Sequence, residues 1–95
     1  MKVEEVLGVL DEIIPLMAAH GHPDKADWLG KESTLLRDTH LSDSEARESL
    51  QRLHRIVPGM GGLMDLPLTG SSVEEEMVAR QTLDKLADQL YQLTR

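Results

Sequence analysis

The chain has 95 residues and a mass of 10.6 kDa, which suits one domain over residues 1–95 with a small core. It contains no cysteine, and this excludes disulfides, thiolate metal ligands and cysteine nucleophiles. Its formal charge of −7 argues against a nucleic-acid partner, because proteins that grip phosphates carry the opposite charge.

The distribution of apolar residues argues against a membrane partner. No apolar run approaches the length of a membrane span. The acidic residues Glu4 and Glu5 are also unlike the basic start of a signal or transit peptide. We therefore expect a soluble protein with a cytoplasmic location.

The first predicted helix extends from about residue 3 to about residue 19. Its apolar residues recur at the three- and four-residue spacing of one helical stripe, namely Val3, Val6, Leu7, Leu10, Ile13, Ile14 and Met17. Pro15 predicts a kink or a break near Ile14. Beyond the helix, Gly21 suits a left-handed cap and Pro23 suits the first position of a second helix.

Two further helices follow, over residues 23–38 and from about residue 43 to residue 56. In the first of these, one face carries Trp28, Leu29, Glu32, Leu35 and Leu36, and we predict that Trp28 is mostly buried. Ser42 and Glu45 form a capping box before the next helix, and Pro58 ends that helix. Its predicted inward residues are Ala46, Leu50, Leu53 and Val57.

A long connection over residues 57–70 contains four glycines and two prolines, which forbid a regular helix. Its apolar residues are Met60, Leu63, Met64, Leu66 and Leu68. Such a loop either folds back over the bundle or offers apolar surface to a partner. Left-handed turns are expected at Gly59, Gly61 and Gly62, and Asp65 is expected to bond local backbone amides.

The fourth predicted helix spans residues 73–94. Ser72 and Glu75 form its capping box, and Glu74–Glu76 place three carboxylates where the helix dipole favours them. Its predicted inward residues are Val73, Met77, Leu83, Leu86, Ala87, Leu90 and Leu93. The sequence therefore predicts an all-α fold, a compact four-helix bundle with a long Gly/Met-rich connection before the last helix.

No group of residues predicts catalysis, a metal site or a cofactor. His20, His22 and Asp24 are too few for a tight metal site, so turn chemistry is the favoured interpretation. His54 and Asp65 lack an activated nucleophile, and His54 is expected to be solvated. The glycines of the connection are followed by no lysine, unlike a phosphate-binding loop.

The negative charge is concentrated at the two ends of the chain. Residues 1–24 hold one lysine against five acids, and residues 73–95 hold three basic residues against five acids. The first and last helices are neighbours in an alternating bundle, so their acids are expected to merge into one face. Such a face either keeps the protein soluble or steers a basic partner. The candidate partner-binding residues are Glu4, Glu5, Asp11, Glu12, Glu74, Glu75 and Glu76, with Met60 and Met64 as apolar anchors.

Two segments carry a family resemblance. Ala26-Asp27-Trp28-Leu29 and the segment from Gly59 to Leu66 resemble a group of small bacterial helical proteins, which share a Trp-x-x-hydrophobic helix and a Gly-Met-Gly-Ser-hydrophobic-Asn-Asp-Leu loop. The likeness covers residues 13–93. Gly62 stands where the family often has Ser, and Met64 where it often has Asn. The resemblance implies no enzymatic activity.

Size and charge together favour a non-enzymatic binding protein. By analogy with other small acidic bacterial proteins, we expect an immunity protein that neutralises a cognate toxin, such as a basic nuclease domain. The alternative is a homo-oligomeric helical module, for example a homodimer in which the connection packs on its own copy. An enzyme is the weakest interpretation.

Overall fold

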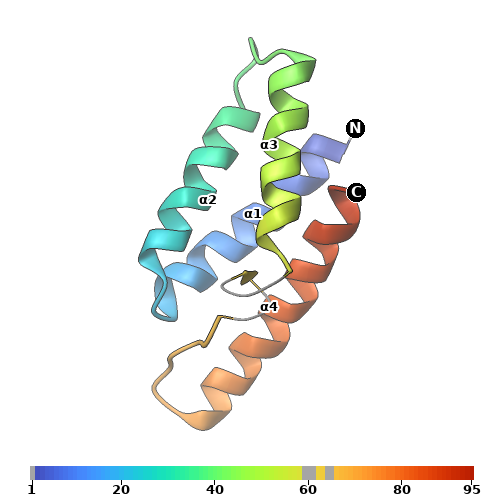
Figure 1. The fold of residues 1–95 in the computed structure, drawn as a ribbon. Coiled ribbons are helices and arrows are strands. Elements are labelled where there is room, and N and C mark those ends of the chain that lie inside the picture. Colours follow the sequence, from blue (N-terminus) through green and yellow to red (C-terminus); the bar gives the residue numbers. More distant parts are fainter. Residues whose placement is uncertain (1, 59–61, 64–65) are drawn as a thin grey trace.

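Four helices in chain order make up the fold. The computed structural model describes residues 2–58, 62–63 and 66–95, and within those ranges it contains no strand. The helices are α1 (Lys2–Ala19), α2 (Pro23–Leu36), α3 (Asp43–Ile56) and α4 (Val73–Leu93), as Figure 1 shows. The predicted all-α bundle is therefore confirmed, and α2 ends two residues before its predicted end at residue 38.

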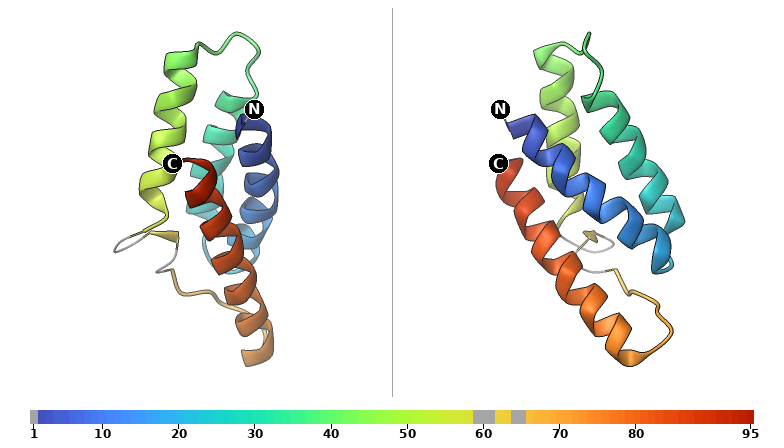
Figure 2. Two further views of the ribbon diagram at one scale, coloured as in Figure 1. Left: turned by 90° about the vertical axis from the view of Figure 1, so that its right-hand side faces the viewer. Right: turned by 180° about the vertical axis from the view of Figure 1, so that it is seen from behind.

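The helices alternate in direction along the chain, and each packs against two others. α1 contacts α2 and α4, and α3 contacts the same two helices. The two views in Figure 2 place both chain ends at the same end of the α1–α4 pair, and they show the first turns of α4 projecting beyond the other helices. The body is elongated, with extents of 44 × 21 × 20 Å. α1 and α4 are therefore antiparallel neighbours, as predicted.

The turn between α1 and α2 has the predicted chemistry. Gly21 has a φ of 95°, a left-handed conformation that glycine adopts readily. The amide of His22 donates to the carbonyl oxygen of Met17 at 2.9 Å and so closes the end of α1. Pro23 lies at the start of α2, where a missing N–H breaks no helical hydrogen bond.

Pro15 lies inside α1, which extends to Ala19 without the break considered near Ile14. The proline ring is exposed, whereas Ile13 and Met17 on the opposite side are buried in the core. Packing of the apolar stripe therefore keeps the segment helical despite the lost backbone hydrogen bond.

Both predicted capping boxes begin their helices. The hydroxyl of Ser42 accepts from the amide of Glu45, and the hydroxyl of Ser72 accepts from the amide of Glu75, each at 3.1 Å. Both serines have extended backbone, the usual conformation of an N-cap residue. The two Ser-x-x-Glu capping boxes therefore predicted correctly where α3 and α4 begin.

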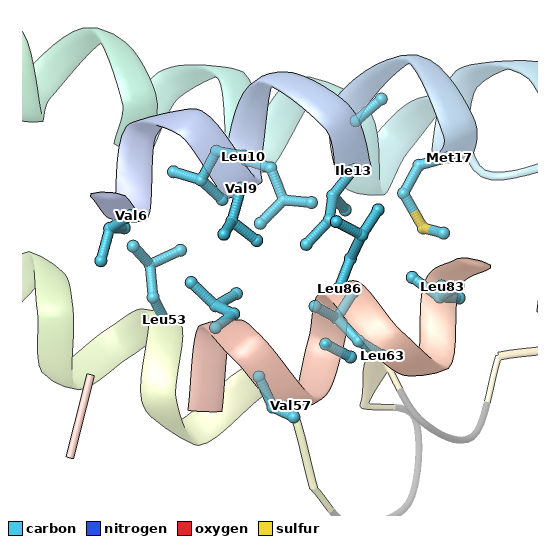
Figure 3. Close-up of a cluster of buried hydrophobic side chains, with 14 of the residues drawn as sticks. Val6, Val9, Leu10, Ile13, Met17, Leu53, Val57, Leu63, Leu83 and Leu86 are labelled. Carbon is cyan, nitrogen blue, oxygen red and sulfur yellow. The ribbon is translucent and has the colours of Figure 1, made fainter. Parts of the chain in front are cut away.

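The core lies where α1 faces the other helices. Figure 3 shows side chains of α1, α3 and α4 pointing into one space, with Leu63 of the connection among them. The largest fully buried apolar side chains are Leu10, Ile13, Met17, Leu29, Leu53, Leu63, Leu83 and Leu90. Every helix and the connection contribute to this core, so its hydrophobic stabilisation depends on the whole described chain.

Trp28 packs against the edge of the core and is mostly buried, as predicted, and Leu29 beside it in sequence is fully buried. Two other residues predicted to be buried lie further out. Val73 and Met77 were predicted to face inward, but their side chains are 72% and 56% exposed. The projection of α4 beyond the other helices explains this error, because no other helix packs over Val73 and Met77 there.

The connection before α4 folds back over the bundle, which is the first of its two predicted alternatives. Leu63 and Leu66 are buried against the helices. The guanidinium of Arg80 donates to the carbonyl oxygens of both residues, at 3.3 Å for Leu63. One α4 side chain therefore satisfies two backbone acceptors of this loop.

The turn at the end of α1 holds the same connection from its other side. Nδ1 of His20 donates to the carbonyl oxygen of Thr69, and the amide of Thr69 donates to the carbonyl oxygen of His20 at 3.0 Å. Nε2 of His22 donates to the carbonyl oxygen of Pro67. Both histidines thus perform the predicted turn chemistry, and they also fasten a segment more than forty residues away.

A buried polar cluster joins α2 to α3. The carboxylate of Glu32 is nearly buried, and it accepts from the hydroxyl of Ser49 and from the guanidinium of Arg52 at 2.9 Å. This hydrogen bond to Glu32 is the main reason that the pKa of Arg52 is raised above its ordinary value. The bonds satisfy a carboxylate that would otherwise be costly to bury.

Candidate protein-binding surface

The four acids of α1 divide between two sides of the helix. Glu5 and Glu12 are seven residues apart and line the seam between α1 and α4. Glu4 and Asp11 have the same spacing but face α2 and its following turn. Asp11 forms an ion pair with Arg37 at 2.6 Å, although both side chains are more than half exposed. Only two of the four predicted α1 candidates therefore face α4.

A continuous furrow follows the seam between α1 and α4. It consists of three open hollows of about 580, 490 and 400 Å³. The first two share Glu12 and Gln89, and the second and third share Thr82, so each hollow continues into the next. We call this surface the α1–α4 furrow. Its lining includes Glu5, Gly8, Val9, Glu12, Leu16 and His20 before the connection, and Glu74, Glu75, Val78, Thr82, Lys85, Asp88, Gln89 and Leu93 from α4.

The end of the furrow nearest the chain termini is acidic. The carboxylates of Glu5, Glu12 and Asp88 line this hollow, and no basic side chain that the structure describes does. Lys85 lines the middle hollow, beside Glu12. The charge along the furrow is therefore negative at this end and mixed in the middle.

The floor of the acidic hollow is apolar and open. Val9 and Leu93 contribute apolar surface, and Gly8 contributes no side chain. A Cβ placed on Gly8 would meet no atom within 4 Å. The missing side chain of Gly8 thus keeps this hollow open, and a substituent of a partner has room between the three carboxylates.

The far end of the furrow contains the first turn of α4. Val78 lines it with its side chain 62% exposed, opposite the half-buried Leu16. Glu74 is exposed beside them. This end therefore combines apolar surface with negative charge.

Two of the three acids at the start of α4 also have structural contacts. The hydroxyl of Ser71 donates to the carboxylate of Glu75, and this bond, with one from the backbone of Ser71, lowers the pKa of Glu75. Glu76 is half-buried beside Gly70. Glu74 is the most available candidate of the three.

The predicted merging of the acids into one face is correct only in part, because Asp88 of α4 joins Glu5 and Glu12 whereas Glu74 and Glu75 do not. Because α1 and α4 are antiparallel, Glu5 and Glu12 meet the last turns of α4, and Glu74 and Glu75 meet the end of α1. Lys85 lies between the two groups. The furrow therefore has two acidic ends.

Several predicted site residues lie outside the described residues. These are the apolar candidates Met60 and Met64 and the turn residues Gly59, Gly61 and Asp65. Gly62 is described and buried, but its φ is not positive as predicted. A Cβ at Gly62 would lie 2.5 Å, 2.6 Å and 2.9 Å from the carbonyl oxygens of Pro58, Ile56 and Val57. Close backbone packing therefore requires this glycine.

Gly8, Val78 and Asp88 are furrow residues that the sequence did not single out. Asp88 lies between Ala87 and Gln89 in α4, and its helical position alone gave no sign of a hollow. The position of Val78 in the sequence could have indicated a surface role, because it lies outside the buried stripe of Ala79, Leu83 and Leu86. An apolar residue off the core stripe of a helix is a candidate for a contact with a partner.

His54 also has structural contacts. The ring of His54 stacks on Tyr91 with centroids 4.1 Å apart, and its Nδ1 lies 3.0 Å from the hydroxyl of Thr94. The prediction of a solvated His54 is therefore wrong, because α4 passes close enough to cover one side of the ring. Among the described residues, no three histidine or acidic side chains are placed to hold a metal ion.

Comparison with known proteins adds no family to these observations. No family model, curated protein or solved structure matches this chain. The resemblance to small bacterial helical proteins stays a prediction. Within the described ranges, no helix has both the length and the apolar character needed to cross a bilayer.

Proposed function

We propose that this protein is a non-enzymatic binding module that acts in the bacterial cytoplasm as an immunity protein. Its partner is the basic domain of a cognate toxin, such as a nuclease. The observation that carries the proposal is the acidic hollow of the α1–α4 furrow, where Glu5, Glu12 and Asp88 surround an apolar floor and no basic residue is found among the described side chains that line it. That combination suits a basic protein surface that brings apolar contacts with it.

The acids and the floor contribute to different stages of binding. An exposed carboxylate adds only about 0.2–1 kcal/mol to a single ion pair. Several carboxylates in one hollow nevertheless raise the association rate, because a focused field attracts the opposite charge over about 8–10 Å. The apolar floor at Val9 and Leu93 is covered only after docking, so it slows dissociation.

A charge-neutral variant of the acidic hollow tests this function. Glu5→Gln, Glu12→Gln and Asp88→Asn together remove three charges and keep side-chain size. All three residues are exposed, so we expect the variant to fold. At low salt it should associate with a cognate basic toxin domain about tenfold more slowly than the parent, with a smaller change in dissociation.

A matched variant removes the same number of charges elsewhere. Glu4→Gln, Asp27→Asn and Glu48→Gln are exposed positions that do not line the furrow. We expect this variant to protect a cell that expresses the toxin, whereas the furrow variant protects it poorly. Equal protection by both variants would show that the acids only keep the protein soluble.

A homo-oligomeric helical module is the second candidate function. It is favoured by the exposed apolar residues Val73 and Met77, which lie on the projecting part of α4 and outside the furrow. Sedimentation velocity over a range of concentrations tests this candidate. A dimer that Val73→Ser with Met77→Ser converts to monomer would support it, and a monomeric parent would eliminate it.

A further inference from the structure

We infer that the α1–α4 furrow binds one amphipathic basic helix of the partner, laid along the seam. This inference rests on the proposed function and names the partner's structure. It is carried by the continuity of the three hollows, the charges along them and the position of Val78. A groove between two helices is a common receptor for the apolar face of a third helix.

The dimensions of the furrow suit a helix. Along α4 it extends from Glu74 to Leu93. Nineteen steps of helix rise at 1.5 Å give a length of about 28 Å. A partner helix of about 18 residues has that length, and its apolar stripe repeats every three to four residues. One end of this partner helix would contact Val78 and Leu16, and its other end would contact Val9.

The charges along the furrow specify which helix it prefers. Carboxylates line both ends, at Glu5, Glu12 and Asp88 near the termini and at Glu74 beside the connection. The only lysine or arginine that lines the described furrow is Lys85, in its middle. A complementary helix therefore carries lysine or arginine at both ends and a neutral or acidic residue near its centre.

Charge also argues against a second copy as the occupant. The chain has a net charge of −7, and its own α4 begins with Glu74–Glu76. A helix of a second copy in this furrow would place like charges together at one end or the other, which is costly. A basic helix instead neutralises both ends.

A synthetic peptide tests the inference without a known partner. The probe is a fluorescein-labelled helical peptide of 18 residues, with leucine on one face, lysine and arginine near both ends and a central glutamate. One comparison peptide has serine in place of each leucine, and another has glutamate in place of each basic residue. Fluorescence anisotropy gives the Kd of each peptide for the intact protein.

Two matched pairs of substitutions locate the binding site. Gly8→Lys enters the furrow, whereas Gly30→Lys lies on α2 outside it, and a Cβ at either glycine meets no atom within 4 Å. Val78→Lys enters the furrow, whereas the neighbouring Met77→Lys does not, and the two side chains are similarly exposed, at 62% and 56%. Each pair adds the same charge in comparable surroundings, and circular dichroism checks the folding of all four variants.

We expect the basic amphipathic peptide to bind the parent protein, Gly30→Lys and Met77→Lys with similar Kd. Gly8→Lys and Val78→Lys should each weaken it by at least about tenfold, because they place a cation against the peptide's basic residues and fill the hollow. The serine and glutamate peptides should bind more weakly than the probe by a similar factor, since both apolar and charge complementarity are needed.

Three results would overturn the inference. They are equal Kd values for all four lysine variants, equal binding of the glutamate peptide, and absence of peptide binding together with self-association that Val78→Lys abolishes. The proposed function fails separately, if the neutral furrow variant protects cells as well as its matched control. Toxin protection that depends on the furrow, without peptide binding, would keep the function and reject the helix.

Discussion

The α1–α4 furrow and the connection before α4 use their polar groups differently. In the connection, the carbonyl oxygens of Leu66 and Thr69 accept hydrogen bonds from Arg80 and His20. In the furrow, Glu5, Glu12 and Asp88 take part in none of the ion pairs found among the described residues. The polar groups of the connection thus hold the fold, and the furrow leaves charge exposed to solvent or a partner.

Gly62 in the connection and Gly8 in the furrow differ in the space around them. Gly62 is surrounded by backbone, and Gly8 faces open space. A glycine in a helix weakens it by about 0.5–1 kcal/mol relative to alanine, so its presence at an open position has a cost. Gly8 lies inside α1 and has this cost, and it keeps a hollow open, whereas Gly62 lies outside the helices and is required by close packing. Substitutions in the two regions should therefore change the stability of the protein in opposite directions.

Substitution of Gly62 should have the largest effect. In Gly62→Ala the new methyl group would lie under 3 Å from three backbone oxygens, so the backbone near Val57 must shift. We expect a loss of about 3 kcal/mol in the free energy of unfolding, at the upper end for overpacking. Chemical denaturation measures it. An unchanged midpoint would mean that the connection is not packed on the bundle as described.

Removal of the guanidinium of Arg80 should have the next largest effect. Arg80→Met keeps the aliphatic part of the side chain but leaves the carbonyl oxygens of Leu63 and Leu66 without this donor. We expect a loss of about 2 kcal/mol in stability, since each lost hydrogen bond is worth about 1 kcal/mol. Amide hydrogen exchange should also quicken at Leu66 more than in α2. A uniform change across the chain would contradict a local role.

Substitution of Gly8 should stabilise the protein, whereas the two preceding substitutions destabilise it. Gly8→Ala adds a methyl group in open space on the exposed side of α1. We expect a gain of about 0.5–1 kcal/mol in the free energy of unfolding, from helix propensity alone. Thermal unfolding compares it with Gly62→Ala. If both alanine variants change stability in the same direction, the contrast between the two regions is wrong.

The charge of Glu75 should make the smallest of these contributions to folding stability. Its pKa is lowered below the ordinary 4.5 chiefly by the Ser71 hydroxyl, so the ionised form favours the folded state. This contribution is present above pH 4.5 and is lost as the pH falls through the lower, folded-state pKa. Glu75→Gln should therefore have a lower Tm than the parent at pH 7, and the difference should shrink in acid. A difference that persists in acid would exclude charge as its cause.

Local signals in the sequence predicted most of the helix ends. Ser42 and Ser72 bond amides three residues later, and Gly21 forms its left-handed cap, because each signal involves only neighbouring residues. The apolar stripe of α1 was also correct, since Leu10 and Ile13 are fully buried. Short-range chemistry of this kind does not depend on which helix packs where.

Predictions that depended on neighbours were less successful. Val73 continues an apolar pattern yet lies on a part of α4 that projects beyond the other helices. His54 lies on the polar side of α3 yet stacks on Tyr91 of α4. Glu32 shares a helix face with leucines yet finds Arg52 on α3. In each case the outcome depends on the length and offset of a second helix, which periodicity within one helix does not encode.

Short-range patterns in the sequence are enough to show that the chain is helical, where each helix begins, and that its charge is negative at both ends. These properties follow from hydrogen bonds and apolar spacing within about four residues. The tertiary structure alone decided that Glu5 and Glu12 meet Asp88 and that Gly8 leaves a hollow between them. The furrow depends on the register of two antiparallel helices more than fifty residues apart in sequence, and that register is fixed by packing of the whole core.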